Sequence, residues 1–321
     1  MKNITKYIPI ILALLMTYDL SAQQQRPVQS LYMFDQLLIN PAYAGSQVQL
    51  SATAIYRNQW VNLEGAPKTL TTSLQSSLLR GKMGVGLVLA KDVIGVHEDF
   101  SLFASYSYRI KMKSTGGTLS MGLQAGFNSI QSDFTKTTVP SVGQGGSGTP
   151  GTSDPFYRAT NALNPNFGGG FFYTNKAFYL GLSAPVLLNN EIIQDTELAL
   201  ETIKNTRTYF VSIGNTFPMS KDFKVIGSTL LRFQEGAPFS FDVNANGVFK
   251  ETVGLGISYR LVEGFVYLFE LKINENFHVG YAYDMTTSGL GRVSNGSHEF
   301  LLNYRIKIPS LHKGLECPSY F

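Results

Sequence analysis

Cysteine, tryptophan and histidine are scarce in this sequence. Its 321 residues include one cysteine, one tryptophan and four histidines. The single cysteine, Cys317, has no partner within the chain, so a disulfide framework is excluded. The histidines, His97, His278, His298 and His312, have no neighbours at metal-ligand spacing. We therefore expect no metal, no cofactor and no catalytic residue.

Charged residues are also few, and apolar residues form no long run beyond the N-terminus. Charged side chains make up 15% of the chain, with a net charge of +4. Lysines and arginines are scattered singly rather than in stripes, which argues against a nucleic-acid partner. No apolar stretch of about 18 residues follows the N-terminal segment, so a helical membrane protein is excluded.

The N-terminus has the pattern of a secretory signal. Lys2 and Lys6 precede an apolar core at residues 8–16, and Ser21-Ala22 ends in a small residue. This order of a basic region, an apolar region and a small residue is typical of a signal peptide. We expect a signal peptide over residues 1–22, with cleavage after Ala22.

Residues 23–47 differ from the rest of the chain in their spacing of apolar residues. Leu31, Phe34, Leu37 and Leu38 have helical spacing, and a proline at position 41 ends any helix. We expect a periplasmic N-terminal segment over residues 23–47 that contains a short helix and a turn.

The most informative pattern is strict alternation, seen clearly in residues 99–112. Even-numbered positions from Phe100 to Met112 are apolar, and odd-numbered ones from Ser101 to Lys111 are polar, with Phe103 as the exception. Alternation of this kind predicts a β-strand with one apolar face. Similar segments recur, giving fourteen expected strands at approximately residues 48–57, 69–79, 83–91, 99–112, 117–130, 165–174, 177–184, 206–217, 222–234, 238–249, 251–261, 264–273, 275–284 and 297–308.

The connections between these strands alternate in length. Long ones cover residues 58–68, 92–98, 131–164, 185–205 and 285–296, whereas short ones lie at 79–82, 175–176, 250 and 274. Outer-membrane barrels have short periplasmic turns and longer extracellular loops, and their strands must close because lipid cannot satisfy a free edge. We therefore expect an all-β protein of the outer membrane. A single antiparallel barrel of about 14 strands would cover residues 48–308, with a periplasmic tail over 309–321.

The polar register of the strands holds many charges, so the interior of the barrel should be polar. The charged positions are Arg109, Lys111, Arg232, Asp242, Arg260, Glu270, Lys272, Arg305 and Lys307. Fourteen strands leave a lumen too wide for wall side chains to fill, so it is either a water channel or plugged. The plug candidates are the glycine-rich residues 143–151, residues 185–205 and residues 23–47.

Two motifs that suggest chemistry have simpler explanations. Glycine pairs such as Gly84 and Gly86 lie inside strands rather than between a strand and a helix, so close packing is favoured over dinucleotide binding. A membrane hydrolase could bring together His278 with Ser297 or His298. Serines are common on every polar face, however, so we expect no enzyme.

Several motifs resemble the PorP/SprF family of Bacteroidetes outer-membrane proteins. They are residues 40–45 (Asn-Pro-Ala-Tyr-Ala-Gly), 56–60 (Tyr-Arg-Asn-Gln-Trp), 64–69 (Glu-Gly-Ala-Pro-Lys-Thr), 280–284 and 296–299. The resemblance implies a barrel that serves type IX secretion. It would bind or anchor a specific secreted cargo, such as a gliding adhesin, at the cell surface.

From this resemblance we expect three kinds of partner. They are a secreted cargo protein with a type IX C-terminal domain, periplasmic or outer-membrane components of secretion or gliding, and the lipid bilayer. Nine residues are carried over as structural or partner-contacting positions: Asn40, Pro41, Tyr43, Gly45, Arg57, Gln59, Trp60, Gly65 and Pro67. The alternative function is an outer-membrane solute channel with an N-terminal hatch.

Overall fold

The computed structural model describes residues 29–47, 50–133, 159–189, 191–196, 199–204, 206–261, 263–287 and 289–306. The expected signal peptide, the glycine-rich residues 143–151, and the tail with Cys317 lie outside these residues.

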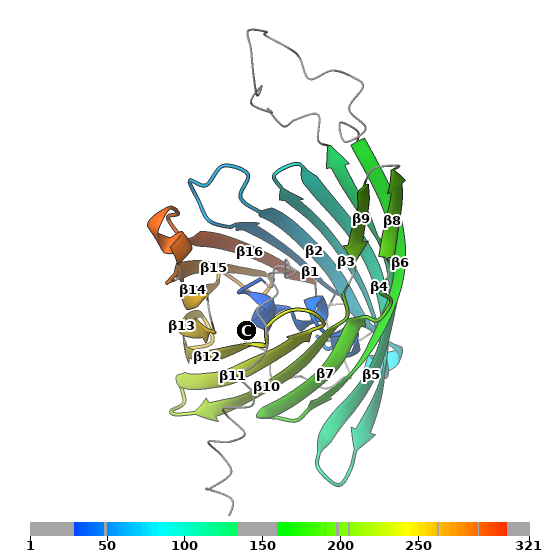
Figure 1. The fold of residues 1–321 in the computed structure, drawn as a ribbon. Coiled ribbons are helices and arrows are strands. Elements are labelled where there is room, and N and C mark those ends of the chain that lie inside the picture. The colour runs from blue at the N-terminus through cyan, green and yellow to red at the C-terminus, as the bar shows by residue number, and fades with distance from the viewer. Residues whose placement is uncertain are drawn as a thin grey trace, which may run out of the picture.

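Fourteen strands of the described residues form one closed antiparallel barrel (Figure 1). They are β1 (Leu50–Asn58), β2 (Lys68–Leu78), β3 (Met83–Ile94), β4 (His97–Met112), β5 (Gly117–Asp133), β6 (Ala159–Thr174), β7 (Phe178–Val186), β10 (Thr208–Pro218), β11 (Phe223–Gln234), β12 (Ser240–Phe249), β13 (Val253–Arg260), β14 (Gly264–Lys272), β15 (Phe277–Thr286) and β16 (Ser297–Ile306). The first strand pairs with the last, from Leu50 opposite Ile306 to Asn58 opposite His298. The predicted barrel is confirmed.

One long connection contains additional structure. Residues 185–205, expected as a loop, include a separate hairpin of β8 (Glu191–Thr196) and β9 (Ala199–Lys204). In the barrel itself, β7 pairs directly with β10 across this insertion.

The predicted two faces of the strands are found in β4. Tyr106, Tyr108 and Ile110 are more than 40% exposed on the outer surface, whereas Ser107 and Arg109 are buried inside. Outward apolar and inward polar side chains are the arrangement that a bilayer imposes on a barrel.

The two ends of the barrel differ in their connections. Turns such as the 3-10 helix η4 (Leu79–Gly81) between β2 and β3 are short. At the other end several connections are longer, one of which contains the 3-10 helix η6 (Gly289–Arg292). The long connection expected at residues 92–98 is wrong, because β3 and β4 extend through it and leave only residues 95–96 between them. We call these the short-turn end and the long-loop end; in outer-membrane barrels the short turns generally face the periplasm. Among the described residues, no helix is long and apolar enough to cross a membrane.

Residues 29–47 lie inside the barrel, where Figure 1 shows them in dark blue, and we call them the plug. In place of one short helix they form three 3-10 helices: η1 (Tyr32–Phe34), η2 (Gln36–Leu38) and η3 (Pro41–Tyr43). The Asp35 side chain caps η2 and the Asn40 side chain caps η3, which divides the segment into short turns.

The plug explains the apolar residues that interrupt the polar register. Leu301 packs with plug residues such as Leu31 in one buried cluster, and Val88 packs against a second cluster that includes Leu37. Phe103, also inward, is 7% exposed. Leu301 and Val88 thus contact the plug from the wall, and this apolar contact stabilises the plug in the lumen.

Candidate functional site

At its upper, N-terminal end the plug is held by a buried ionic cluster. The two oxygens of Glu299 accept hydrogen bonds from the backbone N–H groups of Ser30 (2.7 Å) and Leu31 (3.0 Å). Arg57 forms ion pairs with Glu299 and, at 2.7 Å, with Asp284. The Ser30 hydroxyl donates to Asp284 at 2.9 Å. Arg57 and Glu299 are almost fully buried. Each charge therefore compensates the other, and removing one would leave an uncompensated charge in the interior.

The cluster continues along the inner wall through Arg260. Its guanidinium contacts Asp242 at 3.1 Å and Glu263 at 2.9 Å, and lies 3.9 Å from Asp284. Glu263 belongs to the loop that follows β13. Burial raises the pKa of this carboxyl, but attraction to Arg260, the hydrogen bond from Arg260 and attraction to Arg57 and Arg232 together leave the pKa below its ordinary value. The ionic cluster therefore extends from the plug to the long-loop end.

The middle of the plug is held by Asp35, which is fully enclosed by wall and plug. Its carboxylate accepts hydrogen bonds from the Ser73 hydroxyl, from Gln75 Nε2 at 3.1 Å, and from the Leu37 backbone N–H at 3.3 Å. A buried carboxylate with several donors is well satisfied, and removing any donor is costly.

The motif at residues 40–45 anchors the lower part of the plug. Asn40 accepts a hydrogen bond from the Ala42 N–H at 2.9 Å and donates to the Phe171 carbonyl at 3.0 Å. Tyr43 packs edge-on against Phe172, with ring centroids 5.3 Å apart. Pro41 occupies the first position of η3, where a missing N–H costs nothing.

Wall glycines allow the plug backbone to approach the strands closely. A Cβ on Gly84 would overlap the Ala44 carbonyl, and one on Gly122 would overlap the backbone of Ala42. The same Ala44 carbonyl accepts hydrogen bonds from Ser107 at 2.8 Å and Arg109 at 2.6 Å. Gly45 has φ of +60° and lies against the Ser76 carbonyl, a conformation and a space that favour glycine.

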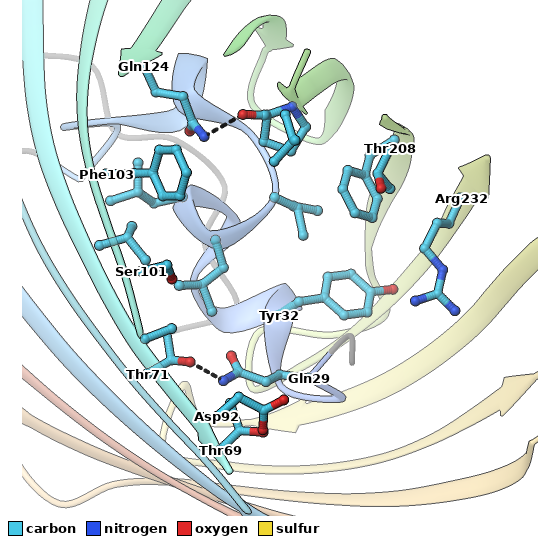
Figure 2. Close-up of a pocket in the computed structure, with 18 of the residues that line it drawn as sticks. Gln29, Tyr32, Thr69, Thr71, Asp92, Ser101, Phe103, Gln124, Thr208 and Arg232 are labelled. Atoms are coloured by element: carbon cyan, nitrogen blue, oxygen red, sulfur yellow. Dashed lines mark hydrogen bonds between the residues drawn. The ribbon is translucent and has the colours of Figure 1, made fainter. Parts of the chain in front are cut away.

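Above the plug is a cavity of about 210 Å³, which we call the well (Figure 2). Its floor consists of plug residues Tyr32, Leu37, Leu38 and Ile39. Its walls come from strand ends that lead to the long loops, and include Thr69, Val88, Ala90, Asp92, Asp99, Ser101, Phe103, Val186, Thr208, Phe210, Arg232 and Gln234. The well therefore opens toward the long-loop end and ends at the plug. It combines an apolar floor with charged walls.

The second predicted motif lies at the long-loop end, beside the ionic cluster. Arg57, Gln59 and Trp60 line a cavity of about 190 Å³ together with Glu263 and Ser297. The backbone N–H of Trp60 donates to the Ser297 hydroxyl at 3.1 Å.

The remaining motif positions shape the β1–β2 loop. The Pro67 carbonyl accepts from the Gln59 N–H at 3.0 Å. Gly65, with φ of +75°, accepts from the Gly95 N–H at 3.0 Å. The structure thus places residues 40–45 near the short-turn end and residues 57–67 at the long-loop end. It does not bring the two motifs together.

The three described residues that could have formed a hydrolase site, His278, Ser297 and His298, are not arranged as one. His278 pairs with Asn303 near the short-turn end, whereas Ser297 pairs with Asp284 near the other end. His298 Nδ1 instead lies 2.7 Å from the Tyr281 hydroxyl. Within the described ranges, no group of three or more metal-ligating side chains occurs.

Sequence reasoning did not single out Asp35, Asp284 or Glu299 as site residues. A signal for Glu299 was present, because closing a barrel pairs its first and last strands, and Arg57 lies inward at the end of the first. No comparable signal existed for Asp35, whose donors in the barrel wall, Ser73 and Gln75, lie 38 and 40 residues away in the sequence.

The fold and the plugged lumen define an outer-membrane β-barrel protein. The family model for the type IX secretion system membrane protein PorP/SprF matches residues 21–304, and the chain belongs to this family. The protein is thus located in the cell outer membrane and serves type IX secretion. The family is of a non-enzymatic, secretion-associated type. No curated protein matches the chain.

Solved structures similar to the chain are outer-membrane barrels of low sequence identity. The CymD monoaromatic hydrocarbon channel shares 13% identity with a TM-score of 0.52, covering 89% of this chain and 94% of that one. The toluene transporter TbuX of Ralstonia pickettii has 10% identity, a TM-score of 0.48 and coverages of 85% and 93%. Omp33 of Acinetobacter baumannii has 8% identity, a TM-score of 0.45 and coverages of 81% and 99%. At these identities the likeness shows the fold alone.

Proposed function

We propose that the barrel holds a specific secreted protein at the cell surface, and that the well and the long loops receive it. The observation that carries this proposal is the plug. It occupies the lumen with side chains that are almost wholly buried, from Leu31 at 0% exposure to Tyr43 at 4%. A well that ends at such a plug is suited to holding a partner rather than to passing a solute.

The form of the partner follows from the closed wall. A barrel has no free strand edge, so recognition uses loops, the well or the chain termini. The apolar floor around Leu38 fits an apolar side chain, and the charged walls, with Asp92 and Arg232, fit polar flanking groups. We assign this site to the C-terminal domain of a type IX cargo, and the short-turn end to periplasmic secretion or gliding components. No catalytic step is part of this function.

Deleting the gene tests the proposal at the level of the cell. We expect one or a few surface proteins to disappear from the cell exterior, while uptake of a small hydrophilic dye stays unchanged. Surface proteomics of mutant and parent gives the first result, and dye fluorescence the second. Unchanged surface proteins together with altered dye uptake would reject the secretion function.

A matched pair of variants tests the well itself. Ala90 lines the well, and its neighbour Leu89 belongs to the opposite, outward register. Ala90→Phe should fill the well and reduce the amount of surface cargo, whereas Leu89→Phe should leave it at the parent level. Heat-modifiable gel mobility verifies that both barrels fold. Equal cargo levels in the two variants would show that the well is not the binding site.

The second candidate function is a solute channel with an N-terminal hatch. The observation behind it is the fold, because the CymD barrel, which the chain resembles, is a hydrocarbon channel. In this function the plug would be a hatch that moves to open the lumen. Conductance in planar bilayers separates the two functions. The anchoring function predicts no stable open state in the intact protein, whereas a channel would show discrete openings.

A further inference from the structure

Lysines surround the barrel at its short-turn end. Five of the six turns at this end contain one, and the sixth turn follows directly after Lys272 at the end of β14. We call these residues the lysine ring: Lys82, Lys113, Lys176, Lys221, Lys250 and Lys272. All are exposed except Lys272, which is half-buried. Each turn at this mouth of the barrel therefore has a lysine in it or directly beside it.

Few acidic residues balance this charge. The short turns contain Asp222, Glu251 and Glu275. In the part of the chain that the structure describes, no ring lysine forms an ion pair, and the nearest ion pair joins Lys224 to Glu251 at 3.8 Å. The long-loop end differs, because Lys91 there pairs with Glu98 at 2.9 Å. The ring thus keeps its charge available for a partner outside the chain.

The lysine ring directly borders apolar surface. Leu79, Met219 and Ile273, next to the same turns, are 62%, 61% and 58% exposed. Lys250 lies 5.4 Å from the centre of the Phe249 ring, and that phenylalanine is 51% exposed. In a bilayer, exposed apolar side chains mark the hydrocarbon, and lysines just beyond them lie at the level of the lipid phosphates.

We propose that the lysine ring binds the headgroups of anionic phospholipids in the periplasmic leaflet. Lysines near a membrane surface attract anionic lipids, and each adds to the attraction. The lysines occur at every turn of this end, which favours lipid over protein as the binding partner. Lipid surrounds the whole barrel, whereas a docked protein requires charge only where it contacts the barrel. This inference is independent of the proposed cargo function, since it concerns the opposite end of the molecule.

Spin-labelled lipids test the proposal with the full chain reconstituted in phosphatidylethanolamine vesicles. We expect labelled phosphatidylglycerol to be immobilised roughly two- to fourfold more strongly than labelled phosphatidylethanolamine, and this preference to vanish in about 1 M salt. The ring variant (Lys82→Gln, Lys113→Gln, Lys176→Gln and Lys221→Gln) should lose the preference at low salt. A control variant with glutamine at positions 68, 91, 207 and 292 removes four basic residues near the long-loop end and should keep it.

Three results would overturn the proposal. One is equal immobilisation of the two lipids by the parent protein, which does not depend on any variant folding. Another is equal loss of preference in the ring and control variants. The last is an unchanged lipid preference in the ring variant together with the loss of a co-purifying acidic periplasmic protein, which would make the ring a protein-docking surface.

Discussion

Arg57 on β1 and Glu299 on β16 lie directly opposite each other across the seam where the first and last strands close the barrel. Glu299 also accepts hydrogen bonds from the backbone N–H groups of Ser30 and Leu31 in the plug. One buried carboxylate therefore belongs to both the wall and the plug, and removing its charge should affect both.

Glu299→Gln should destabilise the barrel by about 3 kcal/mol, because it leaves the buried Arg57 with less compensating charge. It should also speed amide hydrogen exchange at Ser30 and Leu31. Urea unfolding in lipid vesicles measures the first effect, and exchange followed by mass spectrometry the second. The control is Glu98→Gln, whose exposed pair with Lys91 should be worth at most about 1 kcal/mol. Similar losses in the two variants would contradict a shared role of Glu299.

Gly84→Ala should push the plug away from the wall, because the added methyl overlaps the Ala44 carbonyl. We expect a loss of about 1–3 kcal/mol, typical of overpacking. Gly227→Ala on β11 is the matched control, since its nearest neighbour to the added methyl is a Phe217 ring atom at 3.8 Å. Unfolding in urea compares the two. If Gly227→Ala were the more damaging variant, the close approach of plug and wall would not limit stability.

Leu102→Arg and Ser101→Arg test the two faces of β4 at adjacent positions. Leu102 belongs to the outward register and should face lipid, so arginine there should cost roughly 2–4 kcal/mol. Ser101 lines the well, where an arginine has space and water. Heat-modifiable gel mobility gives the fraction of folded barrel. Equal folding of both variants, or a reversed order, would show that the register is wrong.

Single cysteines test which end of the barrel faces outward. In a chain with Cys317→Ser, Asn189→Cys at the long-loop end should react with an impermeant thiol reagent on intact cells. Lys176→Cys, in a short turn, should react only after the outer membrane is opened. Labelling of Lys176→Cys alone on intact cells would mean that the barrel is inserted the other way.

Much of the wall could be predicted from the sequence, because each face of a strand in a barrel meets one environment. Lipid selects apolar residues such as Tyr106 and Leu255 on one side, and the polar interior selects Arg109 and Arg260 on the other. The alternation of apolar and polar residues therefore depends only on neighbouring positions in the sequence, and it can be recognised within a single strand.

The plug could be predicted only as one of three candidates, because its contacts are not local. Ser30 meets Glu299 across 269 residues, and Asn40 meets Phe171 across 131. Apolar residues in the inward register, such as Val88 and Leu301, were a sign that protein fills the lumen, but a single exception does not identify its partner. The β8–β9 hairpin was missed because its strands are short and are not part of the barrel.

The residues that accept hydrogen bonds from the upper end of the plug come late in the sequence, and this fixes the order in which the barrel and plug assemble. The plug precedes every strand in the chain, whereas Asp284 and Glu299, which hold its upper end, belong to the last two strands. During synthesis and membrane insertion, Ser30 and Leu31 therefore have no acceptor until β15 and β16 have joined the sheet. Fixing the plug by these hydrogen bonds is then one of the final steps of folding, and it takes place only once the barrel wall is complete.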